Sequence, residues 1–124
     1  MFKTQVVAKA KGNHVNNVTY LEYLETTRKK LYAYCISLGV EAMVVNINAS
    51  YHHEVFNNEL LTIETTIEKV GNTSITLSQD LYTEKNIKAV SATVVLVTVN
   101  QETREKVRVP DEIRELAKTA LSNA

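Results

Sequence analysis

The sequence has little of what stabilises small secreted or membrane proteins. Its 124 residues contain one cysteine, one proline, three glycines and no tryptophan. Because Cys35 has no second cysteine to pair with, an internal disulfide is excluded, and we expect a reducing compartment such as the cytoplasm. No apolar run approaches the roughly 18–20 residues that cross a membrane. The first residues also lack the apolar core of a secretory signal, so we expect no membrane association.

Excess charge of either sign is absent as well. Lysine and arginine together number 14, as do aspartate and glutamate, and the formal net charge is zero. This balance argues against a broad electrostatic grip on nucleic acid. What is present is an ordinary globular composition, with 44% hydrophobic and 23% charged residues. We therefore expect residues 1–124 to form a single domain whose modest core favours self-association.

The sequence predicts one long helix over residues 18–38. An apolar stripe recurs at helical spacing and comprises Val18, Leu21, Leu24, Leu31, Cys35 and Leu38. Asn16 and Asn17 precede the helix, and either side chain can accept a hydrogen bond from the free amides of the first turn. Gly39 follows as a helix terminator. We place Cys35 in the core rather than in a reactive site.

Beyond Gly39 the pattern changes to the alternation of strands. It predicts strands over residues 2–8, 45–51, 61–68, 75–81 and 87–100, with tight turns at 71–72 and 84–86. Pro110 and the apolar face behind it predict a short C-terminal helix. We therefore expect an α+β fold in which a curved antiparallel sheet of about five strands wraps around the long helix, the four strands after the helix running in meander order. Edge-to-edge pairing of two such sheets would remove one exposed edge from each copy.

The most unusual segment is the polar loop 12–17, which runs directly into the N-terminus of the predicted long helix. That end carries free backbone amides and a positive partial charge. Such amides can polarise a carbonyl and stabilise the oxyanion formed when the carbonyl is attacked. The plainer interpretation is that Asn13, Asn16 and Asn17 only cap the helix and its turn.

The amino-acid sequence of this segment resembles a known motif at the start of a helix. Residues 14–17 read HVNN, residues 20–25 read YLEYLE, and Arg28 follows. This pattern is similar to that of hotdog-fold acyl-CoA thioesterases, in particular the 4-hydroxybenzoyl-CoA thioesterase-like family and its long-chain acyl-CoA members. The resemblance continues through residues 60–64, 70–74, 94–99 and 109–110, and so covers nearly the whole chain.

The resemblance implies a hotdog fold, usually dimeric or tetrameric, that cleaves acyl-CoA or acyl-carrier-protein thioesters without metal or organic cofactor. It implies catalytic roles for Asn13, His14 and Asn17. It also implies that the acyl-CoA substrate contacts Val15, Asn16, Tyr20, Thr73, Ser74 and Arg104. For the phosphates of CoA, further cationic candidates are Lys69, Lys106 and Arg108, although a solvated surface is the plainer interpretation of any one of them.

One position departs from the family pattern. The family usually carries an aspartate four residues before the histidine of HVNN, and that position is Ala10 here. The other common acidic position nearby is Ala8. The loop thus keeps the binding half of the motif and lacks the carboxylate that would activate water or attack the carbonyl carbon.

Several residues are alternatives for the missing base. His14 can act as a base, because histidine is the side chain that commonly exchanges a proton near neutral pH, although it can equally stiffen the loop. Asn17 aligns with a functional histidine of some relatives; it can orient water, but capping is the plainer role. Glu54 and Glu59 could reach the site from a neighbouring subunit, although solvated loop charges are commoner. Glu25 is a further carboxylate, for which a pair with Lys29 is the simpler interpretation.

Other readings of the sequence stay open. The run His52-His53-Glu54 suggests a metal, but adjacent residues of a strand point in opposite directions, so we expect no metal site. The preferred function is hydrolysis of acyl-CoA thioesters. The alternative is a hotdog protein that binds acyl-CoA and has lost hydrolysis together with its carboxylate. A hotdog dehydratase is a weaker third option because the histidine-containing loop of that class is absent.

Overall fold

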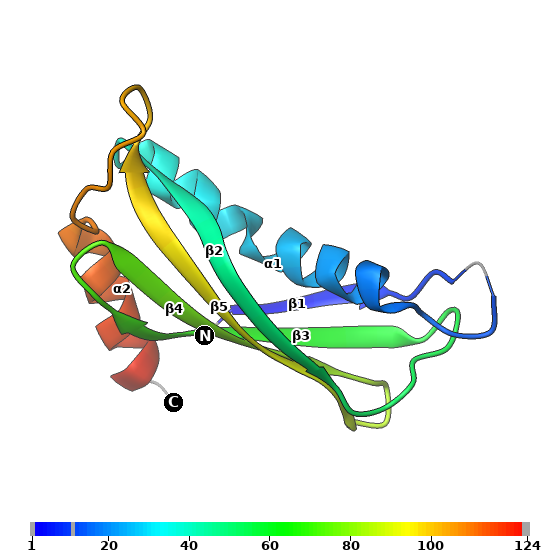
Figure 1. The fold of residues 1–124 in the computed structure, drawn as a ribbon. Coiled ribbons are helices and arrows are strands. Elements are labelled where there is room, and N and C mark those ends of the chain that lie inside the picture. The colour runs from blue at the N-terminus through cyan, green and yellow to red at the C-terminus, as the bar shows by residue number, and fades with distance from the viewer. Residues whose placement is uncertain (1, 11, 123–124) are drawn as a thin grey trace.

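A computed structural model describes residues 2–10 and 12–122 of the chain (Figure 1). All the predicted elements are present. In chain order they are β1 (Phe2–Val7), α1 (Asn17–Ser37), β2 (Val40–Tyr51), β3 (Leu60–Val70), β4 (Ser74–Tyr82), β5 (Lys88–Asn100) and α2 (Asp111–Ser122). The predicted α+β class is confirmed, and the bounds are close to those expected from the periodicity except for β2, which begins at Val40 rather than at residue 45.

The strands form one antiparallel sheet in the order β1-β3-β4-β5-β2 over the described residues. The predicted meander holds only for β3, β4 and β5, whose two tight turns force them to be neighbours. It is wrong for β2, which pairs with β5 at the far edge of the sheet (Figure 1). The segment 52–59 is long enough to carry the chain from that edge to the other side, where β3 pairs with β1.

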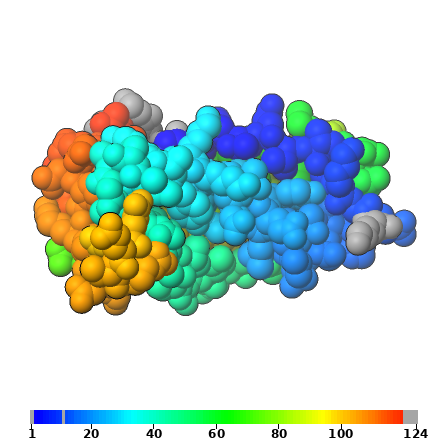
Figure 2. Space-filling model, turned by 90° about the horizontal axis from the view of Figure 1, so that it is seen from above, coloured from blue at the N-terminus to red at the C-terminus, as the bar shows by residue number. Residues whose placement is uncertain are grey.

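The sheet curves around α1, which lies on its inner face between β1 and β2 (Figures 1 and 2). Leu24, Leu31 and Cys35 are buried against the sheet, as the apolar stripe predicted. Val18 of that stripe is instead 59% exposed, because it faces a cleft at the start of the helix. The helix ends at Ser37, and Gly39 turns the chain away with a φ of +87°.

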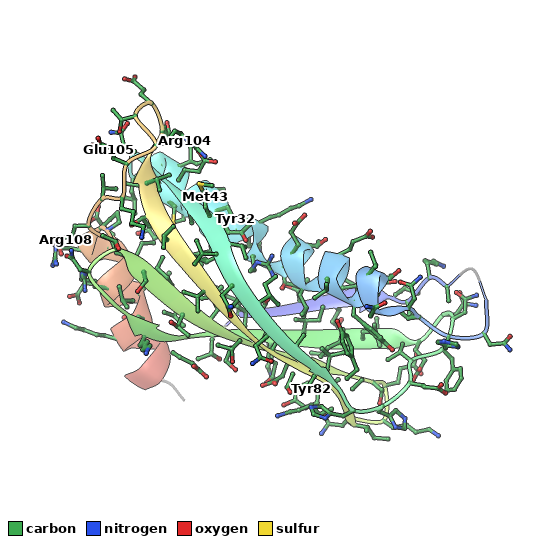
Figure 3. All side chains as sticks on the ribbon, viewed as in Figure 1. Tyr32, Met43, Tyr82, Arg104, Glu105 and Arg108 are labelled. Carbon is green, nitrogen blue, oxygen red and sulfur yellow. The ribbon has the colours of Figure 1, made fainter. Side chains whose placement is uncertain are left out.

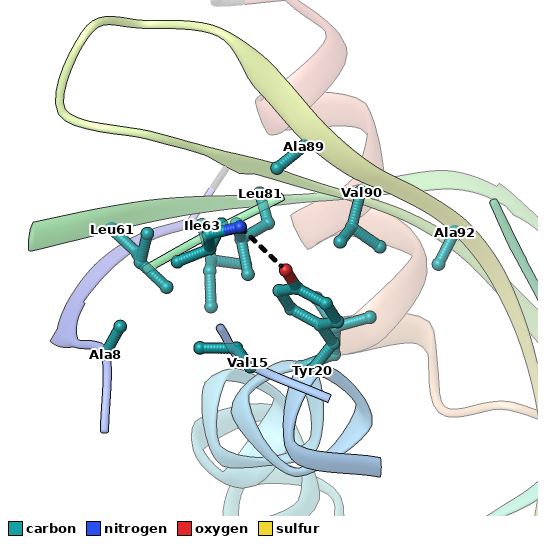
Figure 4. Close-up of a cluster of buried hydrophobic side chains, with 11 residues drawn as sticks. Ala8, Val15, Tyr20, Leu61, Ile63, Leu81, Ala89, Val90 and Ala92 are labelled. Atoms are coloured by element: carbon teal, nitrogen blue, oxygen red, sulfur yellow. Dashed lines mark hydrogen bonds between the residues drawn. The ribbon is translucent and has the colours of Figure 1, made fainter. Parts of the chain in front are cut away.

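The space between α1 and the sheet contains two apolar clusters. One surrounds Leu24 and Tyr20 near the start of α1 (Figure 4), and the other surrounds Leu31 and Cys35 and includes Ile113 of α2. A layer of buried polar side chains lies between them, formed by Thr27, Arg28, Thr65 and Gln79. Over the described residues, neither helix combines the length and hydropathy that crossing a membrane would require.

Candidate active site at the start of helix α1

The N-terminus of α1 is open to ligands. Asn16 is the N-cap, since its side-chain oxygen accepts from the Thr19 amide at 3.0 Å and from the Thr19 hydroxyl at 3.1 Å. Among the described residues, the amides of Asn17 and Val18 have no hydrogen-bond acceptor. These two N–H groups lie at the positive end of the helix dipole and can donate to a ligand oxygen.

The expectation that Asn17 caps the helix is wrong. Asn16 has the extended backbone that an N-cap needs, with φ −87° and ψ 166°, whereas Asn17 is already the first helical residue. The Asn17 side chain makes no hydrogen bond within the described residues, so it stays available to a ligand or a water molecule.

The two asparagines make a matched pair for measuring the cap. We expect Asn16→Ala to lower the free energy of unfolding by about 1 kcal/mol, because the Thr19 amide loses its acceptor. Asn17→Ala should change it by no more than a few tenths of a kcal/mol. Urea unfolding monitored by circular dichroism measures both changes. A larger loss for Asn17→Ala than for Asn16→Ala would contradict this assignment of the cap.

The loop before α1 is held against the segment that follows β2. The Val15 amide donates to the Val55 carbonyl at 2.9 Å, and His14 pairs with Phe56 in an isolated antiparallel bridge. The Val55 amide in turn donates to the Tyr20 hydroxyl at 3.1 Å (Figure 4). These contacts fix the backbone on either side of His14, while its side chain stays exposed.

Tyr20 and Val15, expected to contact the substrate, are mainly core residues. Tyr20 is 5% exposed and Val15 is 3% exposed, and both belong to the apolar cluster around the start of α1. Burial raises the pKa of the Tyr20 hydroxyl, and the hydrogen bond from Val55 only partly offsets this effect. Tyr20 therefore stays protonated at neutral pH and serves as packing and as an anchor for the loop.

A first cleft of about 560 Å³ opens beside the start of α1. Its lining comprises Lys9, Ala10, His14, Asn16, Val18, Thr19, Glu22 and Tyr23. The Tyr23 hydroxyl accepts a hydrogen bond from the Lys9 amide at 2.9 Å, and the Ala10 amide donates to the Asn57 side chain at 3.0 Å. The first bond holds the chain after β1 against α1, and the second holds it against the segment between β2 and β3. Ala10 therefore lines the same cleft as His14.

A second cleft of about 510 Å³ lies on the other side of His14. It is lined by His14, Val15, Asn16, Asn17, Tyr20, Tyr51, His52, His53 and Glu54. The rings of Tyr20 and Tyr51 lie 5.6 Å apart in its wall. His14 and Asn16 line both clefts, so the two cavities meet around the first turn of α1.

The carboxylates that line the clefts around His14 are not all those expected from the sequence. Glu54 lines the second cleft within the same chain, without help from a neighbouring subunit. Glu59 is occupied, because it accepts a hydrogen bond from the Phe56 amide at 2.8 Å. Within the described residues, Glu25 forms no ion pair with Lys29. Glu22 also lines the first cleft, and its place in the YLEYLE run directly after the HVNN motif is the signal in the sequence for it.

Four of the expected site residues line neither of these clefts. Asn13 is exposed and lines neither of them. Thr73 and Ser74 lie at the turn between β3 and β4, and Arg104 lies in the loop after β5, all at the opposite end of the molecule (Figures 1 and 3). Arg104 pairs with Glu41 of β2. A single chain therefore does not bring Thr73, Ser74 or Arg104 to His14.

The first of the two adjacent histidines after β2 contacts strand β5. The Nε2 atom of His52 lies 2.8 Å from the Ser91 hydroxyl. Throughout residues 2–10 and 12–122, no three side chains of histidine, cysteine, aspartate or glutamate are grouped to hold a metal ion.

The fold and this sequence pattern have known counterparts. Residues 11–116 match the model of the thioesterase-like superfamily. The chain belongs to this superfamily. Its relatives include the long-chain acyl-CoA thioesterase FadM of Escherichia coli, which is 29% identical over 109 residues, 82% of this chain and 83% of the relative.

Solved structures of the superfamily agree with the fold. YbaW, a probable thioesterase from Escherichia coli, is 26% identical and superimposes with a TM-score of 0.82 over 97% of this chain and 99% of its own. The DHNA-CoA thioesterase of Staphylococcus aureus is 20% identical and superimposes with a TM-score of 0.82, over 98% of this chain and 91% of its own. The hotdog fold implied by the HVNN motif is thus confirmed.

Proposed function

We propose that this superfamily member hydrolyses acyl-CoA thioesters. The observation that carries the proposal is the pair of free amides, Asn17 and Val18, in the first turn of α1, where two clefts meet at His14; Val18 lines the first cleft and Asn17 the second. A thioester carbonyl oxygen placed there accepts a hydrogen bond from each of the two N–H groups. Negative charge develops on this oxygen as water adds to the carbonyl carbon. One such donor contributes on the order of 10²–10³ in rate.

His14 is the proton acceptor in this proposal. Its imidazole takes a proton from the attacking water, and the water oxygen bonds to the carbonyl carbon. When the tetrahedral intermediate collapses, the carbon–sulfur bond breaks, the acid is released, and the CoA sulfur leaves with the proton from His14. Glu54, in the second cleft, can orient the imidazole or the water, and the Asn17 side chain can hold the same water.

We also propose that two copies assemble through β2. This strand is twelve residues long and forms an edge of the sheet, with one side of its backbone unpaired among the described residues. Its apolar side chains Met43, Val44, Val45 and Ile47 are between 38% and 56% exposed. An unpaired apolar edge of this length is best covered by the same edge of a second copy related by a twofold axis.

Such pairing also brings the separated site residues together. Tyr51, at the end of β2, contacts Tyr20 near His14, whereas Glu41, at its start, pairs with Arg104. In an antiparallel β2–β2 pair, the start of one strand faces the end of the other. The Arg104 end of one copy then lies beside the His14 end of the other, where a cation suits the phosphates of CoA.

Replacing Ile47 tests this assembly. We expect Ile47→Lys to convert a dimer into monomers and to reduce hydrolysis at least tenfold, because a charge is placed on the apolar edge. Ile87→Lys is the matched control: Ile87 is equally exposed, at 39% against 38%, but lies in the turn between β4 and β5. Light scattering after size exclusion measures the mass. A wild-type monomer that is fully active would refute the assembly.

The alternative function is binding of acyl-CoA without hydrolysis, and Ala10 in place of the usual aspartate favours it. Steady-state release of CoA thiol, measured over a panel of short, long and aromatic acyl-CoAs, separates the two functions. Hydrolysis of at least one class with saturation supports the proposal. Saturable binding of the panel, measured by calorimetry, with no turnover above the uncatalysed rate would establish the alternative instead.

A further inference from the structure

Arg28 is a charged side chain in the middle of the protein core. It is 3% exposed and belongs to the polar layer between the two apolar clusters. Its Nε atom donates to the Tyr32 hydroxyl at 2.7 Å, and its Nη1 atom donates to Gln79 Oε1 at 3.0 Å. The guanidinium also lies 5.9 Å from the centre of the Tyr32 ring.

All of these partners are neutral. Within residues 2–10 and 12–122, Arg28 forms no ion pair with a carboxylate, and its Nη2 atom has no hydrogen-bond acceptor. The Gln79 Nε2 atom is itself a donor, to the Leu24 carbonyl and to the Thr27 and Thr65 hydroxyls, so it supplies no acceptor and no negative charge for Arg28. A buried arginine is ordinarily paired with an anion. Among the described residues, the positive charge of Arg28 has no anionic partner.

A small cavity opens beside this guanidinium, between β1 and α1. Its volume is about 230 Å³, and its lining comprises Phe2, Lys3, Thr4, Thr27, Arg28, Lys30, Leu31 and Thr65. Lys30 adds a second positive charge without a carboxylate partner among the described residues, whereas Lys3 is paired with Glu64 at 3.5 Å. The cavity therefore carries net positive charge, hydroxyl groups and an apolar wall.

We propose that this cavity binds a small carboxylate with a short carbon chain. The carboxylate would accept hydrogen bonds from Arg28 Nη2 and from Lys30, and its carbons would contact Phe2 and Leu31. The volume fits a few heavy atoms and is too small for a CoA thioester. The apolar wall favours a carboxylate over inorganic phosphate, which has no carbon to place there. This site lines neither cleft at His14 and does not depend on thioester hydrolysis.

Nuclear magnetic resonance of the full chain tests the site directly. Acetate, propionate, butyrate and inorganic phosphate are each titrated against sodium chloride at constant pH and ionic strength. The Arg28 Nε–H signal and the Thr27 and Thr65 amide signals report on the cavity. We expect saturable shifts of these signals with the carboxylates, tighter from acetate to butyrate, and none with chloride. Non-saturating shifts, or a tighter response to phosphate than to butyrate, would overturn the proposal.

Two variants that keep Arg28 in place sharpen the test. Lys30→Met should weaken butyrate binding at least threefold, whereas Lys29→Met, the same change at a neighbouring exposed residue that does not line the cavity, should leave it unchanged. Thr4→Phe should abolish the saturable shifts by filling the space. Equal effects of the two lysine variants, or unaltered butyrate binding by Thr4→Phe, would refute a site in this cavity.

Discussion

Replacing His14 with alanine is expected to lower kcat for acyl-CoA hydrolysis by about 10²–10⁴-fold, the usual loss when a general base is removed. The side chain is exposed and makes no hydrogen bond within the described residues, so its removal takes little from the folded state. The free energy of unfolding should therefore change by less than about 0.5 kcal/mol. Steady-state kinetics and urea unfolding of the same preparation measure the two quantities.

The two roles open to His14 give different results. If the histidine only stiffens the loop, His14→Ala lowers stability and turnover together, and KM rises as the clefts lose their shape. If it is the base, the loss appears in kcat at unchanged stability, and the acidic limb of the pH–rate profile disappears. Retention of that limb in His14→Ala would transfer the role to another group, for which Glu54, the carboxylate that lines the second cleft, is the candidate.

Ala10→Asp is expected to raise turnover at least several-fold. Ala10 lines the first cleft together with His14 and Asn16, so an aspartate there adds the carboxylate that the family motif usually has. The hydrogen bond from the Ala10 amide to the Asn57 side chain holds the backbone that would carry the new carboxylate. The nearby Lys9 favours the ionised form. The gain is bounded by the effect of one general base, about 10²–10⁴-fold.

Gly12→Asp is the matched control for this gain. Gly12 lies in the same loop, does not line either cleft, and has no atom within 4 Å of an added Cβ. It therefore adds the same charge without placing it beside the free amides, and we expect unchanged kcat. Equal gains in the two variants would trace the effect to net charge, and no gain in a well-folded Ala10→Asp would contradict the geometry proposed for the first cleft.

The sequence predicted the elements of the fold more reliably than their neighbours. Helical spacing located both helices. Alternation located every strand, with bounds within two residues of those in the structure except at β2, which begins at Val40 rather than at residue 45. It does not indicate which strand lies alongside. Only tight turns do, and these occur at Gly71–Asn72 and at 84–86. Between β2 and β3 the loop is longer, and nothing in its residues fixed β2 beside β5 rather than β3.

The buried polar layer could not be predicted from the apolar stripe. Arg28 and Thr27 interrupt that stripe, and a charged residue within a helix is normally assigned to its solvent face. Only the register of β3 and β4, which sets Thr65 opposite Gln79, shows that polar partners for Arg28 lie on the facing sheet. The sequence contained each residue but not the pairing.

The candidate site was predicted in part for a similar reason. The HVNN motif identified His14 and Asn16 together with the helix end that they flank, since these residues are close in the chain. Glu54 comes from the segment after β2 and shares a cleft with His14, beside the point where the Val15 amide pairs with the Val55 carbonyl. Arg104 was assigned to the same site, yet it lies at the far end of the chain's own fold.

In the proposed mechanism, the amides of Asn17 and Val18 donate hydrogen bonds to the thioester carbonyl oxygen. The most direct measurement is a nuclear magnetic resonance titration that follows the backbone amide signals. The ligand is an acyl-CoA analogue that cannot be hydrolysed, because a methylene group separates its carbonyl from the sulfur. We expect the two amide protons to move downfield together at saturation, as new hydrogen bonds form. Saturable binding that leaves both signals in place would contradict it.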